Sequence, residues 1–415
     1  MRVSVEPAHG LMELLGRPQD RFLAVHVAGT KGKGSVAALI GQGLYRAGLR
    51  VGTYASPHVE RVTERVRWPG ETPGDIADDD LAEALEAALG ALDGARKTNA
   101  SATATAEATW FDVLSAAAFH AFATRGVDVG VVECGLGGRL DSTNVIEAPV
   151  CVITNIELEH TAILGDTRTA IAREKAGIIA PESSVIMGLS QSDPAGLTIV
   201  EFAREQGARI HSVAVDESGE RSIAQTNRAL ATAALDEFGR LFAARFPGHR
   251  VPQDQVWGQW ALDAEACAAA CLPGRLERRW IGETPVILDG AHTLESLQAV
   301  LDTLDADSIL PPKRVSVFGT GGEKNAAGLL KTLGPRTDSL LCTSVGPGPY
   351  RAPEELRSIA QELDLDLDAV AIDAPRAALD EALRLAASDG HVLVTGSLHL
   401  IGAVRRFTRA DPPNG

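Results

Sequence analysis

The sequence predicts an α/β fold in which parallel sheets are covered by helices. Short apolar runs rich in Val and Ile alternate with longer stretches that have helical spacing and good helix formers. The runs are nearly continuous in apolar residues, as expected for strands covered on both faces. Alternation of strand and helix along the chain favours parallel sheets wrapped by helices.

The elements follow in chain order from these patterns. Strands are predicted at residues 22–28, 127–133, 150–154, 184–188, 285–289, 314–318 and 391–395. Helices are predicted at residues 34–47, 111–124, 167–176 and 226–238. Residues 92–108 are small, polar and nearly free of bulky apolar side chains, so they are predicted to form a mobile loop.

Length and composition indicate more than one globular domain. At about 150 residues per domain, 415 residues allow two or three domains. Hydrophobic residues make up 45% of the chain and charged residues 23%, which is enough apolar material for a buried core. Residues 246–275 begin and end with Pro and Gly. A boundary there predicts one domain over residues 1–276 and a second, of ordinary size, over residues 277–415.

The charge balance excludes some classes of partner. Acidic residues outnumber basic ones by 55 to 39, for a net charge of −16, so no general attraction to nucleic acid or to an anionic membrane is expected. No run approaches the roughly 18 apolar residues of a membrane span, and no secretory signal is visible. The five cysteines include no C-x-x-C pair, which suits a reducing compartment. We expect a cytoplasmic monomer.

The sharpest local motif is GTKGKGS at residues 29–35, which follows an apolar strand and opens an Ala-rich helix. Glycines let the backbone approach a phosphate, the helix N-terminus presents N–H groups to it, and Lys33 supplies a mobile positive charge. The motif departs from the common G-x-x-x-x-G-K-[ST] pattern, because Val27 occupies the first Gly position and Gly34 follows the Lys. A glycine-rich turn without function is the alternative interpretation.

Further polar motifs follow later strands, and ligands bind open parallel sheets at strand carboxyl ends. In chain order these motifs are SPH at 56–58, ECGLGGRLDSTN at 133–144, TNIELEH at 154–160, REKAGI at 173–178, PGR at 273–275 and LDGAH at 288–292. As an ordered set they resemble the motifs of the folylpolyglutamate synthase and dihydrofolate synthase family, a branch of the Mur ligase superfamily. The resemblance runs from about Phe22 to about Arg406, and Lys31 and Thr293 look like the eukaryotic-type members.

The resemblance implies a fold and a set of site residues. The fold is a parallel-sheet P-loop ATPase domain followed by a smaller, Rossmann-like α/β domain. The residues implied to bind ATP are Gly32, Lys33, Gly34, Ser35, Asn227, Arg275 and Asp289. Ser56 and Glu133 are implied to bind Mg²⁺, and His160 a second metal ion. Lys33, Lys175 and His292 are implied to act in the chemistry, Lys175 as a carbamate, and Ser397 to contact substrate.

Plainer interpretations stay open for single residues. A carboxylate at a strand end is more often solvated, and a single His is more often structural. Lys175 closes a predicted helix and would complement the helix dipole. Trp110 and Phe111 begin a helix in a T-x-F-E-like motif, and they form either a wall on the pterin side or plain core. Cys267 and Cys271, one helical turn apart, are predicted to pack as buried apolar groups rather than to bind metal.

The implied activity is ATP-dependent amide ligation. A folate-type carboxylate would attack the γ-phosphorus of ATP, and the amine of L-glutamate would then displace phosphate from the acyl phosphate. Mg²⁺ and Lys33 would neutralise the charge that opposes this reaction, in a site formed by groups from both domains.

Three other functions are alternatives. One is dihydrofolate synthase activity, and another is ligation of glutamate to a non-folate carboxylate. The latter is favoured because only about 21 residues precede the first strand and the stretch between Gly188 and Asn227 is short. A nucleotide-binding regulatory module is the non-enzymatic alternative.

Overall fold

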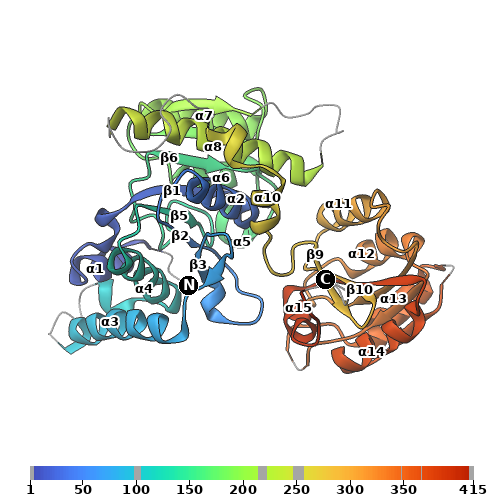
Figure 1. The fold of residues 1–415 in the computed structure, drawn as a ribbon. Coiled ribbons are helices and arrows are strands. Elements are labelled where there is room, and N and C mark those ends of the chain that lie inside the picture. Colours follow the sequence, from blue (N-terminus) through green and yellow to red (C-terminus); the bar gives the residue numbers. More distant parts are fainter. Residues whose placement is uncertain are drawn as a thin grey trace. The chain divides into compact units, whose positions relative to one another are not determined.

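The computed structural model describes residues 4–97, 104–213, 222–245, 257–346, 348–365 and 367–410. The chain divides into two compact units, Met1–Cys271 and Leu272–Gly415 (Figure 1). Each unit is built around its own sheet. The predicted limits of the two functional domains, at residues 276 and 277, stay a prediction.

The first unit contains an eight-stranded sheet in the order β4-β3-β2-β5-β1-β6-β7-β8. Its strands are β1 (Leu23–Ala28), β2 (Val51–Tyr54), β3 (Val66–Trp68), β4 (Gly74–Asp75), β5 (Val129–Glu133), β6 (Val150–Ile153), β7 (Ser184–Met187) and β8 (Arg209–Ser212). The pairings from β2 through β8 are parallel, and only β3 and β4 add antiparallel pairs at one edge. The carboxyl ends of the six parallel strands therefore lie along one edge of the sheet.

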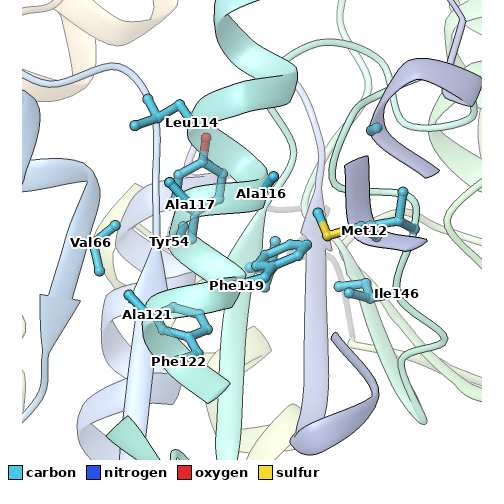
Figure 2. Close-up of a cluster of buried hydrophobic side chains, with 14 of the residues drawn as sticks. Met12, Tyr54, Val66, Leu114, Ala116, Ala117, Phe119, Ala121, Phe122 and Ile146 are labelled. Atoms are coloured by element: carbon cyan, nitrogen blue, oxygen red, sulfur yellow. The ribbon is translucent and has the colours of Figure 1, made fainter. Parts of the chain in front are cut away.

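Helices cover both faces of this sheet. They are α1 (Glu6–Leu14), α2 (Lys33–Arg46), α3 (Asp78–Lys97), α4 (Trp110–Arg125), α5 (Thr161–Leu164), α6 (Arg168–Ala176), α7 (Pro194–Glu205), α8 (Ile223–Arg245), α9 (Trp257–Ala261) and α10 (Ala264–Ala269). Successive residues of a strand point to opposite faces, so Ala24 joins the core under α4 whereas Val25 joins the core under α2 and α8. Figure 2 shows the first of these cores, with Phe119 and Phe122 of α4 beside Tyr54 of β2.

The second unit contains a six-stranded sheet in the order β13-β12-β11-β14-β10-β9, in which only β9 is antiparallel. Its strands are β9 (Glu277–Ile281), β10 (Thr284–Asp289), β11 (Lys313–Phe318), β12 (Ser339–Cys342), β13 (Ala369–Ala371) and β14 (Gly390–Thr395). Its helices are α11 (Leu294–Asp305), α12 (Ala326–Leu333), α13 (Pro353–Glu362), α14 (Pro375–Ala386) and α15 (Leu398–Arg405). This is the smaller α/β unit that the sequence predicts.

The predicted fold class is confirmed, and all the predicted strands and helices occur, with ends within a few residues of those expected except that α8 runs seven residues past its predicted end. The loop predicted at residues 92–108 is wrong at its start, because residues 92–97 are the last turns of α3. Leu92 and Ala95 are buried, so tertiary packing holds this small-residue stretch as helix. Residues 98–103 lie outside the described part of the chain. No helix among the described residues is both long and apolar enough to cross a membrane.

Candidate active site

The GTKGKGS motif forms the turn between β1 and α2, and its glycines are required by close contacts. Gly29 and Gly32 have φ angles of 146° and 78°, in the region that favours glycine. A Cβ on Gly29 would lie 1.9 Å from Oγ1 of Thr154, and one on Gly32 would lie 2.5 Å from Oδ1 of Asn227. The first turn of α2, residues 33–35, presents N–H groups that have no partner within the helix, which suits an anion.

Asn227, implied to contact the adenine base, lies directly against this loop. It is buried in the first turns of α8, and its side chain faces Gly32. Helix α8 can approach α2 closely because Gly43 of α2 faces Leu235, whose side chain would lie 2.4 Å from a Cβ at that glycine. The packing of α8 on α2 therefore places Asn227 at the loop, although almost 200 residues separate them.

The strand order brings a carboxylate and a serine to the same edge. Glu133 ends β5, pairs in register with Val27 of β1, and is only 4% exposed. Its Oε2 accepts a hydrogen bond from the backbone N–H of Ser56, at 3.1 Å. Ser56 follows β2, which is the neighbour of β5 on the other side from β1. Ser56, Glu133 and the phosphate-type loop are thus gathered by three adjacent parallel strands.

Lys175, in the last turn of α6, points into the loop rather than into solvent. It is 4% exposed, and its Nζ donates a hydrogen bond to the carbonyl oxygen of Gly29 at 2.7 Å. Burial, together with the positive charge of Lys33, lowers the pKa of Lys175 to about 8. A substantial neutral fraction of this amine is therefore present at mildly alkaline pH.

The turn after β6 carries His160 and faces the same loop. His160 has a φ of 51°, is exposed, and precedes the short helix α5. Its neighbour Glu159 pairs with Lys31 of the loop, with Nζ and Oε1 3.2 Å apart. Burial opposes ionisation of Glu159, but the charges of Lys31, Lys33 and His160 outweigh it and hold the pKa of this carboxyl below its ordinary value.

In the second unit, Asp289 ends β10, and Arg275 lies just before β9, the antiparallel neighbour of β10. The Asp289 carboxylate is buried and accepts backbone N–H groups from Leu276 at 2.7 Å and Ala291 at 2.8 Å. Burial raises the pKa of Asp289, and Arg275 partly offsets this rise. Nδ1 of His292 lies 2.9 Å from the carbonyl oxygen of Gly290, so Nδ1 carries the proton in this contact.

Ser397 lies at the N-terminus of α15 and accepts the N–H of His399 at 3.2 Å. It lines a pocket at the carboxyl ends of β11, β12 and β14 with Thr320, Thr343 and Tyr350. The Thr320 hydroxyl is buried and has no hydrogen-bond partner within the described structure.

Comparisons with known proteins identify the family. Residues 274–398 match the model of the Mur ligase glutamate ligase domain. The chain is 31% identical to the dihydrofolate synthase/folylpolyglutamate synthase of Mycobacterium tuberculosis, over 97% of this chain and 89% of that protein. The corresponding protein of Escherichia coli is also 31% identical, over 94% of this chain and 87% of its own length. The chain belongs to the folylpolyglutamate synthase and dihydrofolate synthase family.

Solved structures of the family have the same fold. The folylpolyglutamate synthase of M. tuberculosis complexed with ADP has a TM-score of 0.82 and 28% identity, over 99% of this chain and 96% of that one. The E. coli family member in complex with DHPP and ADP has a TM-score of 0.78 and 27% identity, over 98% and 93% of the two chains. Similarity therefore extends through both units and is not confined to the glutamate ligase domain.

The residues at the loop fit the hydrated Mg²⁺ that the family implies. No group of three or more His, Cys, Asp and Glu side chains in the described ranges is arranged to hold a metal ion. Beside the loop of residues 29–35 there is instead one buried carboxylate, that of Glu133, next to Ser56. Mg²⁺ usually keeps several waters and binds one or two carboxylates together with substrate phosphates. This donor set suits Mg²⁺ and does not resemble an all-protein metal cage.

Some organising residues of this family member escaped the sequence analysis. The buried carboxylate of Glu64 accepts N–H groups from residues 59, 60 and 61 and so fixes the turn after the SPH motif. No capping-box signal marks this carboxylate in the sequence, because position 61 is Arg, whose side chain cannot accept a hydrogen bond. Asp141, within the quoted ECGLGGRLDSTN motif, accepts the N–H of Leu136 and the hydroxyl of Thr143.

The structure shows how far two pairs of neighbouring side chains are buried. Phe111 packs against Gly135 and Tyr54 and is partly buried against the core, whereas Trp110 is 56% exposed. The prediction of buried packing for the two neighbouring cysteines is wrong for Cys271, which is exposed because it follows the end of α10. Cys267 is partly buried against the core under α2 and α8.

Proposed function

We propose that this protein is an ATP-dependent ligase that joins L-glutamate to a folate-type carboxylate through an acyl phosphate. The observation that carries the proposal is the convergence of Lys33, Glu133 and Lys175 on the loop between β1 and α2. Family membership over nearly the whole chain supports it. A related bifunctional synthase has been solved with Mn, AMPPNP and L-glutamate bound, which indicates the ligands to test.

The proposed reaction is opposed mainly by charge repulsion, since the carboxylate and the triphosphate are both anionic. The N–H groups of residues 33–35 and the Lys33 ammonium would hold the phosphates and stabilise the transferring group. Ser56 and Glu133 would hold Mg²⁺, and His160 a second ion, which when bound would neutralise phosphate oxygens. Asn227 would orient the nucleotide from α8, because its side chain already lies against Gly32.

We assign the nucleotide to residues 1–276 and the glutamate ligase function to residues 277–415. The match of residues 274–398 to the glutamate ligase domain supports the second assignment. Ser397 would contact the substrate, because it begins α15 directly after the carboxyl end of β14. Asp289 and Arg275 would contact the nucleotide, and His292, three residues after Asp289, would act in the chemistry.

Lys175 is proposed to act as a carbamate. Carbamate forms from CO₂ and a neutral amine, and the pKa of about 8 gives this buried lysine a far larger neutral fraction near pH 7.5 than an ordinary lysine has. The product would be a carboxylate beside Glu133 and the phosphates, where it would serve as a further metal ligand. This is an oxygen donor of the kind that Mg²⁺ prefers.

One assay separates the candidate functions. Phosphate release from ATP is measured with L-glutamate and either tetrahydrofolate, dihydropteroate or no acceptor. Release that needs both glutamate and tetrahydrofolate is expected. Release with dihydropteroate would indicate dihydrofolate synthase activity. If ATP binds but no phosphate is released with either acceptor, ligation to a non-folate carboxylate or a regulatory role would be favoured. We further propose a cytoplasmic monomer, which a molar-mass measurement by light scattering would test in part.

A further inference from the structure

The segment that follows β6 is bonded along the first half of the GTKGKGS loop. Oδ1 of Asn155 accepts the backbone N–H groups of Lys31 at 2.8 Å and of Thr30 at 3.2 Å. The hydroxyl of Thr154 donates to the carbonyl oxygen of Lys31 at 2.6 Å. The hydroxyl of Thr30 accepts the N–H of Glu157 at 3.0 Å. The backbone of Thr30 and Lys31 is therefore bonded to residues 154–157, far along the chain.

An ion pair between Lys31 and Glu159 also connects the loop to the turn that carries His160. Nζ of Lys31 lies 3.2 Å from Oε1 of Glu159, and the two side chains are only 20% and 24% exposed. The other lysine of the loop, Lys33, instead donates to the carbonyl oxygen of Thr30 within the loop itself. The two lysines thus point to different partners, and only Lys31 reaches Glu159 in the described structure.

We propose that Lys31 is a positioning residue that holds the Glu159–His160 turn against the phosphate loop through its ion pair with Glu159. The inference rests on the proposed function, in which His160 contributes to metal binding. It assigns Lys33 to the phosphates and Lys31 to the geometry of the metal-binding turn. Loss of the ion pair then frees the turn. The protein should therefore bind metal-free nucleotide as before but bind the Mg²⁺–nucleotide complex more weakly.

The test is a double-mutant cycle on binding, measured by calorimetry with ADP in EDTA and with ADP plus Mg²⁺. Lys31→Met and Glu159→Gln should each weaken binding of Mg²⁺–ADP about fivefold, the scale of a partly shielded ion pair, and leave metal-free ADP binding unchanged. The double variant should be no weaker than either single variant. Lys31→Arg should stay close to wild type because it keeps the charge. Lys97→Met, at an exposed lysine of the same unit, is the matched control.

Other outcomes would overturn the proposal. If Lys31 binds phosphate directly, Lys31→Met weakens metal-free ADP and Glu159→Gln strengthens it by releasing the lysine. If Glu159 is itself a metal ligand, Glu159→Gln still weakens Mg²⁺–ADP in the Lys31→Met background. Thermal unfolding of each variant separates these effects from misfolding, and the Lys31→Glu/Glu159→Lys exchange gives a second measure, with partial recovery expected. These binding readouts do not require turnover, so a wild-type protein that binds Mg²⁺–ADP without ligating glutamate would contradict only the proposed function.

Discussion

Replacement of Lys175 by Met should remove activity and change the pH dependence of stability in a defined direction. Burial lowers the pKa of this lysine from 10.5 to about 8, whereas in the unfolded chain it returns to its ordinary value. Below pH 8 the ammonium is charged in both states, and the folded state bears the full cost of burying it. At 1.36 kcal/mol per pKa unit, that cost is about 3 kcal/mol. As the pH rises from 8 towards 10.5 the folded protein loses this proton first, so the cost disappears.

The expected result has two parts. Lys175→Met should reduce ligase turnover by about 10²-fold or more, since the proposed carbamate would act on the transferring phosphoryl group. Measured by urea unfolding in CO₂-free buffer at pH 7.0 and 9.5, the stability of wild type relative to Lys175→Met should rise with pH by roughly 1.4 kcal/mol per unit above pH 8. The hydrogen bond to Gly29, worth about 1 kcal/mol, offsets part of the variant's advantage at pH 7 but does not alter the slope.

The variant Lys97→Met, at an exposed lysine of the same unit, is the control for this experiment. A flat stability difference for Lys175→Met would refute the burial of its ammonium. Turnover close to wild type in the folded Lys175→Met protein would remove this lysine from the site. The second result would leave Glu133 and His160 as the only proposed protein ligands to metal besides Ser56.

Three further predictions concern other parts of the molecule. Lys33→Ala should lower the rate of phosphate release by about 10²-fold or more, and unchanged turnover would contradict the assignment of residues 29–35 as a phosphate-binding loop. Burial lowers the pKa of His26 to about 3, so below pH 6.5 the unfolded state binds a proton that the folded state does not. The free energy of unfolding should therefore fall by about 1.4 kcal/mol per pH unit from pH 6.5 towards pH 3. His26→Gln should reduce this slope, measured by acid unfolding. The five cysteines should titrate as free thiols in denaturant, with full activity in dithiothreitol; loss of activity in dithiothreitol would contradict an inert role for them.

The local sequence was sufficient to predict most strands and helices. Strands such as β5 and β10 are continuous apolar runs because helices cover both their faces, and this composition is visible without any partner. The phosphate loop was predictable for the same reason. Gly29, Gly32 and Lys33 lie within a few residues of one another between a strand and a helix, so the motif is visible in one short segment.

Tertiary structure alone decided how these local pieces combine. The strand order β2-β5-β1 puts Ser56 and Glu133 beside the loop, and nothing in a single segment specifies which strands become neighbours. The burial of Lys175, which moves its pKa and suits it to carbamate formation, exists only because α6 packs behind Gly29. The pairing of Lys31 with Glu159 joins residues 128 positions apart. The sequence determined which chemical groups this protein has and the backbone that presents them; long-range packing determined which of them are close, desolvated and therefore able to act on one another.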